Sequence, residues 1–227
     1  MLIDLLRANL SFGVFMAILV AYLAVLLISF SLHEFSHAFA AYKHGDYTAK
    51  YAGRMTLNPF AHFNLYGFIC LIIFGFGWAN PVPVNPLNYN KGKKSMFAVS
   101  IAGITANLLL AIFFSFLASL IGTFAPNWLY NGFWGTLLYY FLNYGMAINI
   151  MLAIFNLLPF YPLDGFQILE LILKPTNKFL QFMQKYSTII LLLLMLFGFI
   201  SFVLTYVLQF LELGLLTMWT SLFRLFM

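Results

Sequence analysis

The stretch "SFSLHEFSHAFAAYKHGD", residues 29–46, places His33, Glu34 and His37 at the end of a long uncharged run. This run extends from Asn9 to Leu32, about the 20 residues that a helix needs to cross the hydrocarbon core of a bilayer. The HEFSH stretch continues the run, so we expect one helix to carry both. Ionisable side chains in a membrane span are energetically unfavourable and indicate a functional site.

The composition is that of a polytopic membrane protein. Of the 227 residues, 63% are hydrophobic and only 7% are charged, and the mean hydropathy is +0.95, which excludes an ordinary soluble domain. The net charge of +5 is scattered and lacks the interleaved aromatic residues typical of nucleic-acid binding, so we expect no nucleic acid partner. The single cysteine, Cys70, excludes an intramolecular disulfide and a cysteine-ligated zinc cluster.

Further uncharged runs continue the membrane pattern. We expect an all-α polytopic fold with about four to six transmembrane helices. The whole chain, 1–227, forms one membrane-embedded domain, with a core over roughly 9–174 and C-terminal helices over roughly 186–227. The runs lie at Met96 to Phe124, from near Gly132 to Asp164, and at Tyr186 to Leu211, and residues 213–227 form either an interfacial helix or part of another crossing.

Two segments between the first and second runs have a different character. The apolar run from Leu65 to Trp78 is short, which favours a re-entrant or interfacial segment over a full span. Before it, apolar residues alternate with Lys50 and Arg54 over residues 47–56. This alternation predicts either a strand or β-hairpin near the motif or an irregular loop.

The basic residues predict how the chain is oriented. They flank the short apolar segment on both sides, and positive charge is typical of cytoplasmic loops. The amino terminus therefore lies outside, and both HEFSH and the later LDG sequence lie near the cytoplasmic face. The basic residues on this side are Lys43, Lys50, Arg54, Lys91, Lys93, Lys94, Lys174, Lys178 and Lys185.

HEFSH has the HExxH pattern of zinc hydrolases. Histidines four residues apart lie on one face of a helix, so His33 and His37 can bind one zinc ion. Glu34 would then lie beside a water molecule whose pKa zinc lowers to about 7, and it could accept the proton of that water. The alternative for an isolated match is a pair of histidines that only form hydrogen bonds at a helix end.

A catalytic site with two histidines needs a third protein ligand. Asp4 and Glu212 lie toward the opposite face, and we expect Asp46 and His44 to be solvated loop residues. Asp164 is the best candidate, because it follows a long apolar run within "PFYPLDG", and such helix breaks are tolerated where backbone lines a cavity. Its alternative role is that of an N-cap for the segment that starts at Gly165.

With these motifs in place, the sequence resembles the site-2 protease family, the intramembrane zinc metalloproteases. The resemblance covers about Ser29 to Glu170. HEFSH resembles the family's HExxH, "NLLPFYPLDG" resembles its second motif, and "GRMTLNPFAHFNLYG" with "FGWANPVPVN" is similar to the compact bacterial and archaeal subgroup without PDZ or CBS domains.

The resemblance implies one Zn²⁺ per chain, held by His33, His37 and Asp164, with Glu34 as general base and Asn156 as a substrate-binding residue. The substrates would be transmembrane proteins cut within or near a membrane segment, in the membrane of a prokaryotic cell. It also suggests that residues 47–56 pair with an unwound substrate by β-addition.

Two other functions remain open from the residues. A membrane zinc protease of another HExxH class would use a later glutamate, Glu170 or Glu212, as third ligand. A catalytically inactive scaffold would keep the fold but would not need Glu34. The chain also departs from the subgroup at Asn64 and Ile104, which concerns substrate fit and loop geometry. For His62 and Asn107, the alternative to a functional role is a structural one, in which each side chain forms hydrogen bonds that stabilise the fold.

Overall fold

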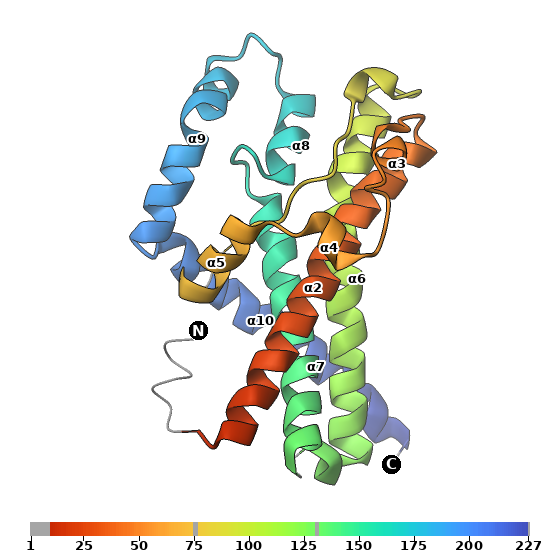
Figure 1. Ribbon diagram of the computed structural model, residues 1–227, viewed down its shortest axis with the longest axis vertical. Coiled ribbons are helices and arrows are strands. Elements are labelled where there is room, and N and C mark those ends of the chain that lie inside the picture. Colours follow the sequence, from red (N-terminus) through yellow and green to blue (C-terminus); the bar gives the residue numbers. More distant parts are fainter. Residues whose placement is uncertain (1–9, 75–76, 130–131, 227) are drawn as a thin grey trace.

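The computed structural model describes residues 10–74, 77–129 and 132–226 (Figure 1). This part of the chain is helical and contains no strand, which confirms the predicted all-α fold. The elements are α2 (Phe12–Lys43), α3 (Thr48–Tyr51), α4 (Pro59–His62), α5 (Leu65–Phe74), α6 (Lys93–Phe124), α7 (Gly132–Leu157), α8 (Asp164–Ile172), α9 (Lys178–Leu196) and α10 (Phe199–Phe223), with 3₁₀ turns at Pro86–Asn88, Pro126–Leu129 and Arg224–Phe226.

Three long helices, α2, α6 and α7, pack side by side and form the centre of the molecule (Figure 1). Small residues at every fourth position of α2 let the other helices approach closely. Ala17, Ala21, Val25 and Ser29 are each 0% exposed, and His33 is the next residue in this series. The face of α2 that packs in the bundle is therefore also the face that carries the histidines.

A buried amide chain joins the three helices. Asn107 of α6 donates to the side-chain oxygen of Asn149 on α7 (2.8 Å), and Asn149 donates in turn to Ser29 Oγ on α2 (2.8 Å). Polar side chains in an apolar bundle need such partners, and hydrogen bonds between helices then fix their relative positions.

Five helices of the described chain are long and apolar enough to cross a membrane. The C-terminal part differs from the predicted run, because the helix stops within it. α9 ends at Leu196, and Gly198 adopts a left-handed φ of 72° before α10 begins at Phe199. Glycine has no Cβ to oppose this conformation, so it can end one helix and redirect the chain into the next. The spans in this region are Lys178–Leu196 and Phe202–Phe226.

The predicted strand or hairpin in residues 47–56 is wrong. The segment forms the single turn α3 between Gly45 and Gly53, which both have positive φ, and continues as an irregular loop. The Asp46 carboxylate accepts the backbone N–H of Thr48 (3.1 Å), and such a bond favours a helical turn over an extended chain. The apolar segment that follows forms the short helix α5, at Leu65–Phe74, which lies beside the bundle, between α2 and α9 in the view of Figure 1.

Candidate active site

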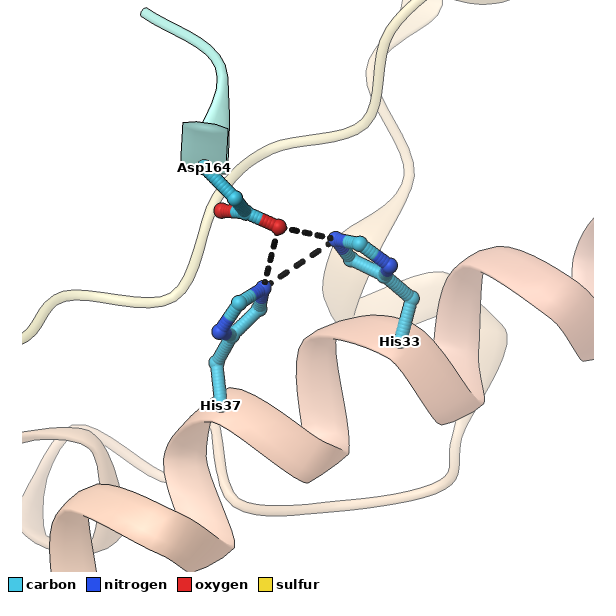
Figure 2. A group of neighbouring side chains, drawn as sticks. All are labelled: His33, His37 and Asp164. Atoms are coloured by element: carbon cyan, nitrogen blue, oxygen red, sulfur yellow. Dashed lines mark hydrogen bonds and ion pairs between the residues drawn. The ribbon is translucent and has the colours of Figure 1, made fainter. Parts of the chain in front are cut away.

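The structure brings together three side chains from two helices. His33 and His37 project from one face of α2 toward Asp164, the first residue of α8 (Figure 2). The two histidine Nε2 atoms are 3.1 Å apart, and Asp164 Oδ2 lies 3.1 Å from that of His37 and 3.4 Å from that of His33. All three side chains are buried.

The hydrogen bonds of the imidazoles determine which nitrogens can bind a cation. His37 Nδ1 faces the carbonyl oxygen of Val99 (2.7 Å), and His33 Nδ1 faces Asn107 Oδ1 (2.6 Å). Both Nδ1 atoms are therefore donors, so a neutral imidazole presents the lone pair of Nε2 to the centre of the cluster.

This donor set fits zinc. Two imidazole lone pairs and one carboxylate oxygen converge, and these atoms repel one another unless a cation lies between them. The atoms that bind a tetrahedral zinc at about 2.0–2.1 Å lie roughly 3.3 Å from each other, close to the separations of these three atoms. Among the described residues, His33, His37 and Asp164 are the group that could hold a metal ion in this way.

Gly103 of α6 provides the space for the imidazoles. A Cβ at this position would overlap His37 Nε2 and the ring of His33. Asn107 lies one helical turn later, so the same face of α6 leaves room for the rings and binds one of them. Asn107 was a candidate from the sequence, whereas Gly103 was not, because its position in "AGITAN" was the only signal for it.

A break between α7 and α8 brings Asp164 to the histidines. The chain leaves the helix after Leu157 and starts α8 at Asp164, as the Pro-containing sequence predicts. Gly165 lies so close to the carbonyl of Leu157 that a Cβ would overlap it. The glycine of the LDG sequence thus allows α8 to begin directly against the end of α7. The carboxylate of Asp164 faces the histidines (Figure 2).

Glu34 lies beside the cluster and is held by the loop that contains the "ANPVPVN" sequence. Residues 79–85, here called the strap, run between α5 and α6, and the backbone N–H of Val82 donates to Glu34 Oε2 (2.8 Å). The strap, α2, α7 and α8 enclose a cavity of about 310 Å³ that includes His33, Glu34, His37 and Asp164 in its lining.

Asn156 also lines this cavity, near the end of α7. Its amide nitrogen donates to the carbonyl of Leu152 (2.9 Å), which orients the side chain at the cavity wall. All five predicted site residues therefore meet at one cavity.

The other candidates have different surroundings. Glu170 accepts a hydrogen bond from Gln184 (2.9 Å), and neither Glu170 nor Glu212 belongs to the cluster. His62 is buried, and its Nε2 donates to the carbonyl of Thr56 (2.9 Å), as its structural role predicts. The expectation that Asp46 is solvated is wrong, because its side chain is buried by the turn that ends the strap. Asp4 lies outside the described residues.

Comparisons with known proteins show the family of the chain. The model of peptidase family M50 matches residues 131–198, the part that contains Asn156 and Asp164. A relative from Bacillus subtilis (strain 168), provisionally named zinc metalloprotease YwhC, is 42% identical over 158 residues, which are 69% of this chain and 71% of that protein. The chain belongs to peptidase family M50.

More distant relatives share the same provisional description. The zinc metalloproteases Rip2 of Mycobacterium tuberculosis (strain H37Rv) and MJ0611 of Methanocaldococcus jannaschii are 32% and 31% identical, over 81% and 62% of this chain and 68% and 64% of their own lengths. No solved structure gave a significant match. With its apolar helices and its histidine–aspartate cluster, this M50 peptidase is a zinc metalloprotease of the membrane.

Proposed function

We propose that this M50 peptidase hydrolyses peptide bonds within or near transmembrane segments of membrane proteins. His33, His37 and Asp164 hold one zinc ion, and Glu34 is the general base. The observation that carries the proposal is the convergence of three lone-pair donors beside Glu34, in a cavity at the end of a membrane-spanning helix. A protease for membrane helices needs its site at membrane depth and a polar cavity that admits water.

The residues of the chain divide the chemistry between them. Zinc, when bound, supplies a Lewis acid that polarises the scissile carbonyl and lowers the pKa of water to about 7. Glu34 takes the proton of the attacking water and returns it to the leaving amine. The N–H of Val82 holds one carboxylate oxygen of Glu34, so the other can face the water. Asn156, at the wall of the cavity, binds the backbone of the substrate near the reacting bond.

The active site faces the cytoplasm in this proposal. The end of α2 that carries the motif lies at the same end of the molecule as the starts of α6 and α9 (Figure 1). These starts contain Lys93, Lys94 and Lys178, and clustered positive charge is typical of cytoplasmic loops. The cell membrane would be that of a prokaryote, as it is for the relatives from bacteria and an archaeon.

The test compares purified wild type with Asp164→Ala, Glu34→Gln and Asn156→Ala, each for zinc per chain and for cleavage of a model transmembrane substrate. Wild type should bind about one zinc ion and cleave. Asp164→Ala should lose zinc, whereas Glu34→Gln should keep it and lose cleavage by a factor of about 10³ or more. Asn156→Ala should keep zinc and cleave more slowly.

Other outcomes would identify the alternatives. Zinc that is independent of Asp164 would return a later glutamate to consideration as third ligand. A wild type that is loaded with zinc and cleaves nothing would support an inactive scaffold. Full cleavage by Glu34→Gln would reject Glu34 as the base.

A further inference from the structure

Asp46 is a buried carboxylate that takes no part in the proposed reaction. It is 0% exposed, and the ion pairs among the described residues join histidines to Asp164 and do not include Asp46. Its oxygens instead accept hydrogen bonds from the backbone N–H of Asn85 (2.6 Å), from Asn88 Nδ2 (2.9 Å), and from the backbone N–H and hydroxyl of Thr48. A buried charge needs this degree of hydrogen bonding, and a neutral side chain could not accept all of these donors.

The carboxylate is ionised at neutral pH. Burial raises the pKa of Asp46, but the hydrogen bonds from Asn85, Asn88 and Thr48 outweigh it and bring the pKa below its ordinary value. Charge-assisted hydrogen bonds of this kind are about twice as strong as neutral ones.

The donors come from two separate parts of the chain. Thr48 follows the end of α2, the helix that carries Glu34, whereas Asn85 ends the strap. A second bond joins the same two parts, from the backbone N–H of Asn90 to the carbonyl of His44 (2.9 Å). Asp46 therefore fastens the end of the strap to the end of the helix that carries Glu34.

The strap can transmit this attachment to Glu34. Pro81, Pro83 and Pro86 restrict the backbone φ on both sides of Val82 and Asn85, so the segment is stiff. Val82 is buried against Ala38 of α2 and Ala49 of α3, and its N–H reaches Glu34. If the hydrogen bonds to Asp46 were lost, this half of the strap would keep, among the described residues, only the bond from Val82 to Glu34 and the bond from Asn90 to His44.

We infer that Asp46 is a positioning residue that anchors the strap, so that the N–H of Val82 orients Glu34 for proton transfer. This inference rests on the proposed role of Glu34 as base. Asp46 itself touches neither the substrate nor the histidine–aspartate cluster, because its partners are Thr48, Asn85 and Asn88.

The first test is Asp46→Asn. This change replaces one carboxylate oxygen, which accepts hydrogen bonds, by an NH₂ group, which cannot accept them from the surrounding N–H donors. Cleavage should fall at least tenfold, with zinc content unchanged, and the amides of Val82 and Asn85 should exchange hydrogen faster. Glu170→Gln is the matched control, because it neutralises a carboxylate of α8 outside the strap, and it should cleave like wild type.

The second test restores the anchor by other means. In an Asp46→Asn chain with Cys70→Ser, cysteines replace Thr48 and Asn88, whose Oγ1 and Nδ2 are 3.4 Å apart. A short bis-methanethiosulfonate, which bridges these cysteines through two disulfide bonds, should restore most of the cleavage, and reduction of those bonds should remove it again.

The results separate this inference from the proposed function. Full cleavage by Asp46→Asn beside an inactive Glu34→Gln would overturn the anchor and leave the base in place. A bridged variant that stays inactive would also overturn the anchor. Full cleavage by Glu34→Gln would instead reject the proposed function on which the inference rests.

Discussion

At the scale of single residues, Gly103 matters as much as the side chains that it accommodates. It is the point where α6 has only a hydrogen atom between its backbone and the imidazoles of His33 and His37. Alanine would normally stabilise a helix by up to about 1 kcal/mol relative to glycine, so any loss that it causes here must come from steric overlap.

We therefore expect Gly103→Ala to displace the imidazoles and to lose most of its zinc, as measured by metal analysis of purified protein. Gly122→Ala is the control in the same helix, because a Cβ there meets no atom within 4 Å. It should keep its zinc. Equal zinc content in the two variants would show that the rings can move without loss of the metal.

At the scale of elements, the turn between α9 and α10 depends on the conformation of one residue. Gly198 has a φ of 72°, and a residue with a Cβ is destabilised by roughly 1–2 kcal/mol in this region. The turn separates two candidate spans that would otherwise form one helix.

Gly198→Ala should therefore lower the thermal stability of the protein in detergent, by an amount consistent with about 1–2 kcal/mol. Gly214→Ala, within α10, is the control, since nothing lies within 4 Å of its Cβ and its φ is helical. It should unfold at or slightly above the wild-type temperature. If both variants unfold together, the left-handed turn is not a constraint on the C-terminal helices.

How far the sequence predicts these elements depends on where the deciding contacts lie. The apolar runs and HEFSH predicted α2 and its histidine face, because helical periodicity is local. The burial of Asp46 was not predictable in this way. Its partners include a backbone N–H at Asn85, far along the chain, and no residue type marks that group as a donor to Asp46. The helix end at Gly198 was not predictable either, since a glycine within an apolar run occurs both inside continuous helices and at helix ends.

At the scale of the whole molecule, the polar turns separate into two ends. The 3₁₀ turn at Pro86–Asn88 lies at the end of the bundle that holds α3, and the turn at Pro126–Leu129 joins α6 to α7 at the other end (Figure 1). Leu87 is 93% exposed and Trp128 is 74% exposed, so both positions can report the side of the membrane.

A cysteine at each position, in a Cys70→Ser chain, should react from opposite sides. With a membrane-impermeant maleimide on intact spheroplasts, we expect Trp128→Cys to be labelled, and Leu87→Cys only after permeabilisation. The reverse pattern would place the active site on the outer face and would contradict the proposed orientation.

Because 127 residues separate His37 from Asp164, the histidines and the aspartate of the proposed site enter the membrane at different stages of synthesis. A chain that is still entering the membrane already carries its histidines in the first crossing, yet it lacks the carboxylate until the third crossing and the break after it have been delivered. A chain that ends before Asp164 would therefore lack the third ligand of the proposed zinc site. The proposed ligand set is thus complete once α8 begins, before α9 and α10 have been added.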